Sequence, residues 1–335
     1  MLKTRSNRSF TVLLIVFIIQ VLVSMLKFYA WRVTESNAVM TDALESIANI
    51  IGGAIALYSI WLANRPADKE HPYGHGKIEF VSSGIEGGLI LLSGIFIIGK
   101  SIQSLVVGAD LPTALGFGSA LVLISGAVNA ILSFVLFREA TASNSHAIKA
   151  SAVHLRSDVL TSIALLISLG ILYITHLAWL DPVIAIGFGC LIVYQALKIL
   201  RESLGGVMDE SNVELIIWFI KNLETNRRDE WIDLHNLRII RYGSTLHIDA
   251  HLSIPWYFDI RQGHEIVEEI REVAIANSKQ NIEFFIHTDP CIPDKQCEIC
   301  SVENCMQRQA KLVNKVPWNP ANVVENAKHS LNTAL

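Results

Sequence analysis

The sequence predicts an α-helical membrane protein with six transmembrane helices, followed by a cytosolic α+β ferredoxin-like domain in the order α-β-β-α-β. The chain has 335 residues, of which 51% are hydrophobic and only 17% are charged. Its apolar residues gather in runs near ~20 residues, the length of a helix that crosses a bilayer. From about residue 203 onward the composition changes to that of a soluble domain.

Six apolar runs are long enough to be spans. The first is too long, and too closely followed by the others, to be a cleaved signal peptide. The six predicted spans are Phe10 to Trp31, Val39 to Ala63, Phe80 to Leu105, Leu115 to Phe137, Ala150 to Ile174 and Leu180 to Leu200.

The positive charges between the spans predict the topology. Basic residues precede span one, separate spans two and three, and separate spans four and five: Lys3, Arg5, Arg8, Arg65, Lys69, Lys77, Arg138 and Lys149. The opposite side has Lys27, Arg32 and Lys100, and none in "ITHLAWLDP". Because loops rich in Lys and Arg stay in the cytoplasm, both termini are predicted to be cytoplasmic.

The soluble part has its own pattern. "DESNVELIIWFIKNLE" has helical periodicity, "LHNLRIIRYG" and "TLHIDAHLSIP" are typical of strands, "RQGHEIVEEIREVAIA" of a helix and "NIEFFIHTDP" of a last strand. We therefore expect three parts: a transport domain over residues 1–205, a small helix-on-sheet domain over 206–290, and a Cys-containing tail over 291–335 with little periodicity.

Two spans carry ionisable residues at helical spacing. His154 and Asp158 lie one turn apart in span five, and Asp42 and Ser46 repeat that spacing in span two, near Asn49. An ionisable group in hydrocarbon costs at least ~2.5 to 3.5 kcal/mol, so such groups usually serve a function. Imidazole nitrogen with carboxylate oxygen suits Zn²⁺ or a first-row neighbour. The alternative is plain hydrogen bonding between helices.

Two further clusters lie outside the spans. The loop "RPADKEHPYGHGK" holds Asp68, His71 and His75 close together, as a metal site or as a solvated polar loop. In "TLHIDAHLS" the period-two alternation places the apolar residues on one face of a strand and His247, Asp249 and His251 on the other. His235, His264, His287 and Asp289 lie elsewhere in the same small domain, as ligands or as surface residues.

Together these motifs resemble the cation diffusion facilitator family, in its bacterial zinc/iron-type divalent metal/proton antiporters. The resemblance rests on Asp42 with its i+4 partner, the loop D-x-x-H-x-x-x-H, the H-x-x-x-D of span five and the final "HTDP". It covers nearly the whole chain, to about Asp289, and implies an intramembrane transport site of Asp42, Ser46, His154 and Asp158. It also implies a second site of Asp68, His71 and His75, and a cytosolic binuclear site at a homodimer interface, formed by His235, His251, His264, His287 and Asp289.

The chain departs from the bacterial zinc-type pattern at Ser46, where that pattern has a second Asp. A hydroxyl is a poor ligand beside a carboxylate, so Asn49, Glu45 or a water is the alternative that would complete the shell. Zn²⁺ is expected as substrate and as structural or regulatory ion, with Fe²⁺, Cd²⁺, Co²⁺ and Mn²⁺ as alternatives. Unlike many eukaryotic members of that family, the chain has no His-rich run between spans four and five, so the resemblance implies a protein of the bacterial inner (plasma) membrane.

Four cysteines follow the region of resemblance in "CIPDKQCEICSVENC": Cys291, Cys297, Cys300 and Cys305. The central C-x-x-C is a common chelating spacing, and cytosolic thiols are reduced and available to soft metals. Structural or regulatory metal binding is the leading interpretation, with an iron-sulfur cluster or inert thiols as alternatives. The fifth cysteine, Cys190, is expected to pack within span six.

The ligand types also predict the mechanism. Since His154 binds metal only when neutral and the carboxylates only when ionised, protons and metal compete for one site, and export in exchange for protons follows. The expected partners are divalent cations, protons, the bilayer and a second copy of the chain, and no nucleic acid. An intramembrane metalloenzyme is disfavoured because "HEIVEE" has Glu268 where H-E-x-x-H needs its second His. A membrane-anchored metal sensor without transport is the remaining alternative.

Overall fold

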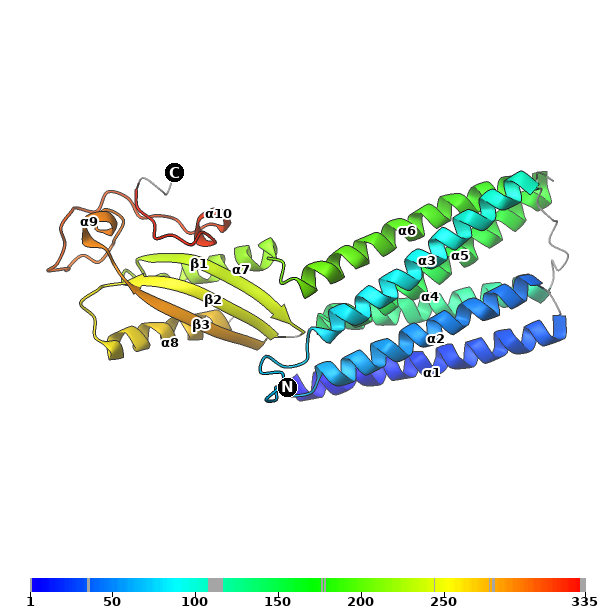
Figure 1. Ribbon diagram of the computed structural model, residues 1–335, viewed down its shortest axis with the longest axis horizontal. Helices are drawn as coiled ribbons and strands as arrows, with labels where there is room; N and C mark the ends of the chain where they lie inside the picture. Colours follow the sequence, from blue (N-terminus) through cyan, green and yellow to red (C-terminus); the bar gives the residue numbers. More distant parts are fainter. Residues whose placement is uncertain are drawn as a thin grey trace. The chain divides into compact units, whose positions relative to one another are not determined.

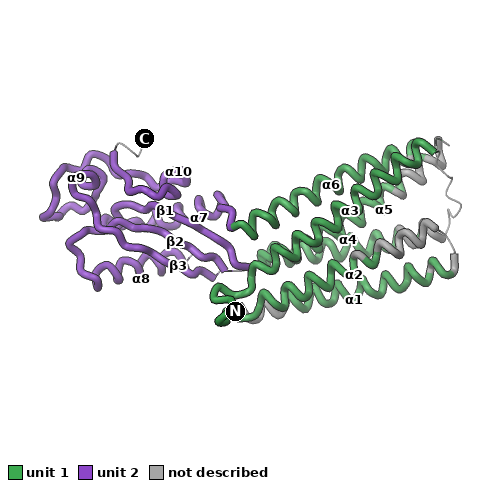
Figure 2. The backbone as a smooth tube through the Cα atoms, viewed as in Figure 1, with its two compact units in different colours: residues 1–208 green, residues 209–335 purple. Residues whose placement is uncertain are grey.

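The computed structural model describes residues 2–34, 37–107, 117–175, 177, 179–243, 245–276, 278 and 281–331. The chain divides into two compact units, residues 1–208 and residues 209–335 (Figure 2). The first unit is helical, and the second contains a three-stranded sheet with helices packed on it.

Six long helices form the first unit (Figure 1). They are α1 (Leu2–Thr34), α2 (Asn37–Ala63), α3 (Ile78–Val107), α4 (Phe117–Ser143), α5 (His146–Thr175) and α6 (Leu180–Val207). Each predicted span lies within one of these helices, except that the fourth was predicted to begin at residue 115, outside the described residues. The predicted order of a helical domain followed by an α/β domain is confirmed.

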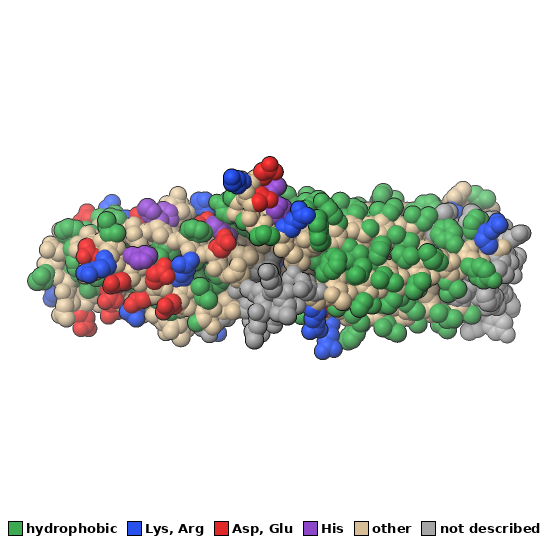
Figure 3. Space-filling view, turned by 90° about the horizontal axis from the view of Figure 1, so that it is seen from below, with side chains coloured by type: hydrophobic (Ala, Val, Ile, Leu, Met, Phe, Trp, Pro, Cys, Tyr) green, Lys and Arg blue, Asp and Glu red, His purple; other side chains and the backbone are tan. Residues whose placement is uncertain are grey.

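The surface of the helical unit is apolar. Within the described residues, four stretches are long and apolar enough to cross a bilayer: Arg8–Tyr29, Ile78–Val107, Leu123–Ser143 and Pro182–Val207. The two other helices, α2 and α5, are those with the predicted polar faces. Figure 3 shows hydrophobic side chains over most of the visible helical surface, whereas charged and histidine side chains gather mainly on the other unit.

Helix α5 takes part in two apolar clusters. Its Leu155 belongs to a cluster shared by α1, α2 and α4, which includes Leu13. Its Ala150 packs in a second cluster with Ile90 of α3 and Ile192 of α6. The polar residues of α5 are thereby held among helices from both clusters.

Small residues let α3 and α6 approach closely. A Cβ on Gly206 would lie 2.2 Å from the Phe80 ring, and a Cβ on Gly94 would lie 2.8 Å from the Val193 side chain. Small residues are the usual means of close helix packing in membranes, where burial of apolar surface supplies little drive. On one side, α5 therefore packs against a closely associated pair of helices.

The second unit has the predicted order α-β-β-α-β. Its elements are α7 (Val213–Thr225), β1 (Asp233–Tyr242), β2 (Thr245–Ile254), α8 (Ile260–Ala276) and β3 (Asn281–Pro290). The sheet order is β1-β2-β3, with β1 antiparallel to β2 and β2 parallel to β3. A parallel pair needs a long crossover, and α8 supplies it.

The apolar face of the sheet forms the core of this unit. The apolar residues predicted to share one face of β2 are all buried: Leu246, Ile248, Ala250 and Leu252. They belong to one cluster with Phe219 of α7 and Ile270 of α8. The side chains on the other face of β2, which include His251, make their contacts outside this core.

Residues 291–331, predicted as a tail, pack on the sheet unit. They contain two short helices, α9 (Pro293–Gln296) and α10 (Pro320–Val323). Trp318 and Val323 belong to the same apolar cluster as Phe219, and the Arg227 guanidinium lies 3.9 Å from the Trp318 ring centroid, a cation–π contact. Asn319 begins α10 with a capping box. The tail is therefore part of the folded unit.

Candidate functional site

The polar centre of the helical unit is built around His154 and Asp158. Four residues apart on α5, they share one face of the helix. Asn49 of α2 joins them, because its Oδ1 accepts a 2.6 Å hydrogen bond from His154 Nε2 and its Nδ2 donates a 2.6 Å hydrogen bond to Asp158 Oδ2. His154 is only 8% exposed. An amide from a second helix thus holds the predicted pair together.

The other two predicted intramembrane ligands belong to α2. Ser46 is buried and lies three residues before Asn49, on the same face of the helix. The side chain of Asp42 lies outside the described residues. The structure therefore brings His154 and Asp158 together, and it places Ser46 on the face of α2 that carries their link.

Two further amides extend this centre, and neither was predicted. Asn129 of α4 donates a 3.4 Å hydrogen bond from Nδ2 to Asp158 Oδ2. Its Oδ1 accepts a 2.9 Å hydrogen bond from Gln20 Nε2 of α1. Four helices therefore contribute polar groups around Asp158. The sequence signal was one amide in each of two apolar spans, which is also typical of ordinary helix pairing.

A buried carboxylate, Glu86 of α3, lies near the same centre and was also not predicted. It is 1% exposed, its Oε1 accepts a 2.7 Å hydrogen bond from Ser151 Oγ, and its Oε2 has no hydrogen-bond partner in the described structure. Glu86, Asn49 and His154 line one cavity. An ionisable residue within a span usually has a function, so the glutamate in "SSGIEGG" was a signal in the sequence.

The loop between α2 and α3 brings its predicted ligands together. Asp68 Oδ1 accepts hydrogen bonds from the backbone N–H groups of His71 (2.7 Å) and Glu70 (3.0 Å), and His71 Nδ1 lies 3.2 Å away. His75 Nε2 lies 3.5 Å from Asp68 Oδ2. The backbone hydrogen bond from His71 is the main reason that the pKa of Asp68 is lowered. Gly74, with φ of 83°, allows the turn that returns His75 to Asp68.

The strands align the histidines of the second unit in a row. His235 of β1 lies opposite His251 of β2, which lies opposite His287 of β3. Asp289 Oδ2 is 3.1 Å from His235 Nε2 and 3.2 Å from His251 Nδ1, and its Oδ1 is 3.6 Å from His287 Nε2. The first two histidines and Asp289 have ligand atoms within 4.8 Å of one another. His264, on α8, is exposed and is not part of that group.

Asp233 lies behind this cluster, two residues before His235 on β1. Its Oδ2 is 3.4 Å from His235 Nδ1, and its Oδ1 is 2.5 Å from Nδ1 of His329 in the tail. Burial would raise the pKa of Asp233, but its contacts with the two histidines outweigh burial and lower it to about 2. Neither Asp233 nor His329 was predicted, although the D-x-H spacing on a strand was visible in the sequence.

The four tail cysteines line one cavity, together with Tyr257 and Arg308. Burial raises the pKa of Cys291 and Cys300, and neighbouring thiols add to that effect. Arg308 donates hydrogen bonds to four backbone carbonyls of the surrounding loop, those of Cys297, Cys300, Val302 and Ala310. The sulfurs do not form a group within 4.8 Å in the described structure. The cysteines are thus neighbours, but they do not form a preassembled metal site.

Comparison with known protein families matches both units. Residues 13–207 match the cation efflux transmembrane domain, and residues 221–291 match the cytoplasmic domain of cation efflux proteins. Together these matches cover the four helices around Asp158, the loop triad and the three strands that carry the histidine row.

Curated relatives are similar over most of their length. An uncharacterized transporter of Synechocystis sp. is 32% identical over 265 residues, 79% of this chain and 85% of the relative. The cation-efflux pump FieF of Citrobacter koseri is 28% identical over 81% of this chain and 89% of the pump. The manganese efflux system protein MneP of Bacillus subtilis is 28% identical over 87% of this chain and 99% of that protein.

These matches decide among the classes that the sequence left open. A metalloenzyme is excluded, and a sensor without transport is set aside, because both units match domains of efflux proteins. The chain belongs to the cation efflux family, as a multi-pass membrane transporter of divalent cations with a cytoplasmic C-terminal domain.

Proposed function

We propose that this transporter exports a divalent transition metal, with Zn²⁺ the leading candidate, in exchange for protons. The observation that carries the proposal is the Asn49 bridge between His154 and Asp158 inside the apolar helical unit. An imidazole nitrogen and a carboxylate oxygen are suited to Zn²⁺ and its first-row neighbours. Such groups are rarely kept within spans without a function.

Proton exchange follows from the chemistry of these ligands. A cation binds His154 only through an unprotonated nitrogen and binds Asp158 only as carboxylate, so protons and the cation compete. Asn49 Oδ1 accepts a hydrogen bond from His154 Nε2, the nitrogen that would face a cation at this centre. Asn49 must therefore release His154 when a cation binds at that atom. With protons flowing inward down their gradient, the exchange runs as metal export.

Flux through proteoliposomes tests this proposal. Vesicles containing the purified full chain should take up Zn²⁺ when their lumen is made acidic relative to the outside, and the lumen should become more alkaline as zinc enters. Zinc flux that is unaffected by the pH difference, and that moves no protons, would contradict exchange while leaving metal transport in place.

Ser46→Asp is expected to tighten divalent cation binding by about tenfold. It would add a carboxylate on the face of α2 that carries Asn49, and a carboxylate is a stronger ligand than a hydroxyl. The apparent KM for Zn²⁺ and Mn²⁺ uptake in proteoliposomes measures the effect. Ser46→Ala, which removes the hydroxyl without adding charge, is the matched control. An unchanged KM in a folded Ser46→Asp protein would place residue 46 outside the ligand shell.

The choice of metal, the setting and the assembly complete the proposal. One relative is named for manganese, so Mn²⁺, Fe²⁺, Co²⁺ and Cd²⁺ belong in the same flux measurements. The relatives compared are bacterial, which supports a bacterial plasma membrane. We further propose that the Asp68, His71 and His75 triad is a second cation site, and that the cytoplasmic domain forms a homodimer.

The cytosolic cluster of His235, His251 and Asp289 is proposed as a regulatory metal site. Its donors fit such an ion, since two imidazoles and a carboxylate converge within 4.8 Å. His287 extends the row at the exposed side of Asp289. His264 is exposed on α8, so we assign it to this site only as a ligand that a second copy of the chain would bring.

The cysteine cavity is proposed as a soft-metal site, and replacing all four cysteines by Ser is expected to remove it. Burial and the neighbouring thiols raise the pKa of Cys291 and Cys300, so these thiols lose their protons less readily. A bound cation would balance the charge of the thiolates and so favour their ionisation together. We expect the variant to lose bound Zn²⁺, measured by elemental analysis of reduced full-length protein, and to unfold at a lower temperature. Cys190→Ser serves as control. Equal zinc content in the wild type and the four-Ser variant would show that the thiols are inert.

A further inference from the structure

The end of the tail pairs with an irregular point of β1 beside the metal cluster. The pairing of β1 with β2 shifts register between His235 and Arg238, and Asn236 has a left-handed φ of 51°. Such a bulge takes a residue out of the ladder and re-aims its neighbours. The Asn236 N–H donates a 2.7 Å hydrogen bond to the carbonyl of Glu325 in the tail. The tail thus satisfies the amide that the bulge withdraws from the sheet.

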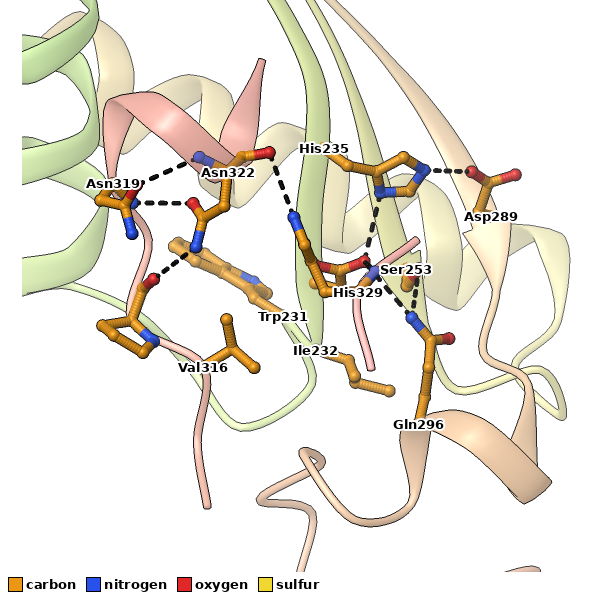
Figure 4. A network of polar contacts seen from close by, with 12 residues as sticks. Trp231, Ile232, His235, Ser253, Asp289, Gln296, Val316, Asn319, Asn322 and His329 are labelled. Carbon is orange, nitrogen blue, oxygen red and sulfur yellow. Dashed lines mark hydrogen bonds and ion pairs between the residues drawn. The ribbon is translucent and has the colours of Figure 1, made fainter. Parts of the chain in front are cut away.

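A chain of polar contacts then runs from the tail to the cluster (Figure 4). His329 is 1% exposed, its Nε2 lies 3.1 Å from the Asn322 carbonyl, and its Nδ1 and backbone N–H contact the two oxygens of Asp233 at 2.5 and 2.9 Å. Asp233 Oδ2 faces His235 Nδ1, and His235 Nε2 faces Asp289. The 3.4 Å between Asp233 Oδ2 and His235 Nδ1 is an ion-pair distance, and that nitrogen has no hydrogen bond in the described structure. A carboxylate in this place behind a ligand histidine orients its ring when it closes on the nitrogen.

Lys328, the residue before His329, also contacts this cluster, but its positive charge opposes cation binding. Lys328 Nζ donates a 2.9 Å hydrogen bond to the Pro290 carbonyl and lies 3.8 Å from Asp289 Oδ1. An ammonium beside a carboxylate ligand competes with an incoming cation for the same charge. Of these two consecutive tail residues, His329 thus contacts the carboxylate behind a ligand histidine, and Lys328 lies beside a ligand carboxylate.

We propose that the docked C-terminal tail sets the divalent cation affinity of the cytosolic cluster, with His329 as a positioning residue and Lys328 as a competing charge. The inference rests on the proposed metal site of His235, His251 and Asp289, and it adds the control of that site by the tail. By linkage, a tail that changes cation affinity is itself held more tightly, or less tightly, when the cation binds.

The test measures Zn²⁺ affinity by calorimetry on the full chain in detergent. The background carries Asp158→Asn, Asp68→Ala and Ser at the four tail cysteines, so that zinc reports on the cytosolic cluster. His329→Leu should weaken binding by up to about 10-fold, the lower end of the 10- to 100-fold cost of removing a direct partner of a ligand, because His329 acts through Asp233. His329→Asn, which keeps a donor toward Asp233, should restore affinity to within about threefold of the background protein.

Lys328→Gln should tighten zinc binding about two- to fivefold, as expected for removal of one partly exposed charge. Lys311→Gln, the same change at an exposed tail position, should leave affinity as it was. The Lys328 variant lies outside the apolar core, so it tests the proposal even where His329→Leu impairs folding. Equal affinities in the His329→Leu, Lys328→Gln and background proteins would overturn tail control.

Hydrogen exchange separates this failure from failure of the metal site. Zinc should change the exchange rate of residues 325–331 and of the Asn236 amide in the background protein, and it should have no such effect when Asp289→Ala is added. If zinc binding is the same with and without Asp289→Ala, the cluster is not the site and the proposed regulatory function fails first. If Asp289→Ala abolishes binding but the tail variants do not change it, only the tail inference fails.

Discussion

Asp158→Asn is expected to slow metal flux through proteoliposomes by at least about 100-fold. The change removes the charge that a divalent cation requires, and even the loss of a group that only supports a ligand costs 10- to 100-fold. The shape of the side chain is retained, and an amide oxygen at this position still accepts from Asn49 Nδ2. The helices should therefore pack as before, and the loss should appear in flux rather than in protein yield.

Glu139→Gln is the matched control for this substitution. Glu139 is also a buried acid in the helical unit, but Ser9 Oγ donates to its Oε1 at 2.7 Å and Arg8 Nε lies 3.3 Å from its Oε2. Both carboxylate oxygens of Glu139 already have partners, so we expect metal flux through the Glu139→Gln protein to stay within about twofold of wild type. Normal Zn²⁺ and Mn²⁺ flux in Asp158→Asn would reject the proposed transport site.

Asp289→Ala should have the second large effect, on zinc binding by the cytosolic cluster. Asp289 contacts three histidines, one on each strand, and Lys328 as well. Its removal leaves neutral imidazoles and no anionic ligand, so we expect Zn²⁺ affinity at this cluster to fall by about 100-fold or more. Equilibrium dialysis of the full chain with elemental analysis measures the loss.

The same variant tests whether zinc promotes dimerisation. If metal binds the dimer more tightly than the monomer, it must shift the dimer equilibrium by the same free energy. Sedimentation of the wild type should therefore show tighter dimers with zinc, whereas Asp289→Ala should respond little. Asp249→Ala, which removes a half-exposed acid on β2 that lies 3.4 Å from His247 Nε2, is the control. A zinc response in Asp289→Ala equal to that of wild type would separate dimerisation from this cluster.

The fold could be predicted from the sequence because its signals are local. Apolar runs of bilayer length gave the helices, and the alternation in β2 gave the inward face of the sheet. The pairing of candidate ligands was also local where both lie on one element, as with His154 and Asp158. The loop triad was predictable for the same reason, since its members lie within eight residues.

The remaining site residues depend on contacts between distant elements. Asn129 contacts Asp158, and Gln20 contacts Asn129, only because α1, α4 and α5 pack together. A single amide in an apolar span does not reveal its partner. Glu86 was different, because a carboxylate within a span is a signal in itself. His329 could not be predicted, since its partner Asp233 lies 96 residues earlier in the chain.

The docked tail changes where the cytosolic unit ends as a folding unit. The match to the cytoplasmic domain stops at residue 291, yet Trp318 and Val323 belong to the same apolar cluster as Trp231 and Phe219. Removing such a large buried side chain costs roughly 2 to 5 kcal/mol, a large share of the stability of a small domain. A chain cut at residue 291 would expose that core to solvent. The tail should therefore melt together with the sheet in one cooperative transition.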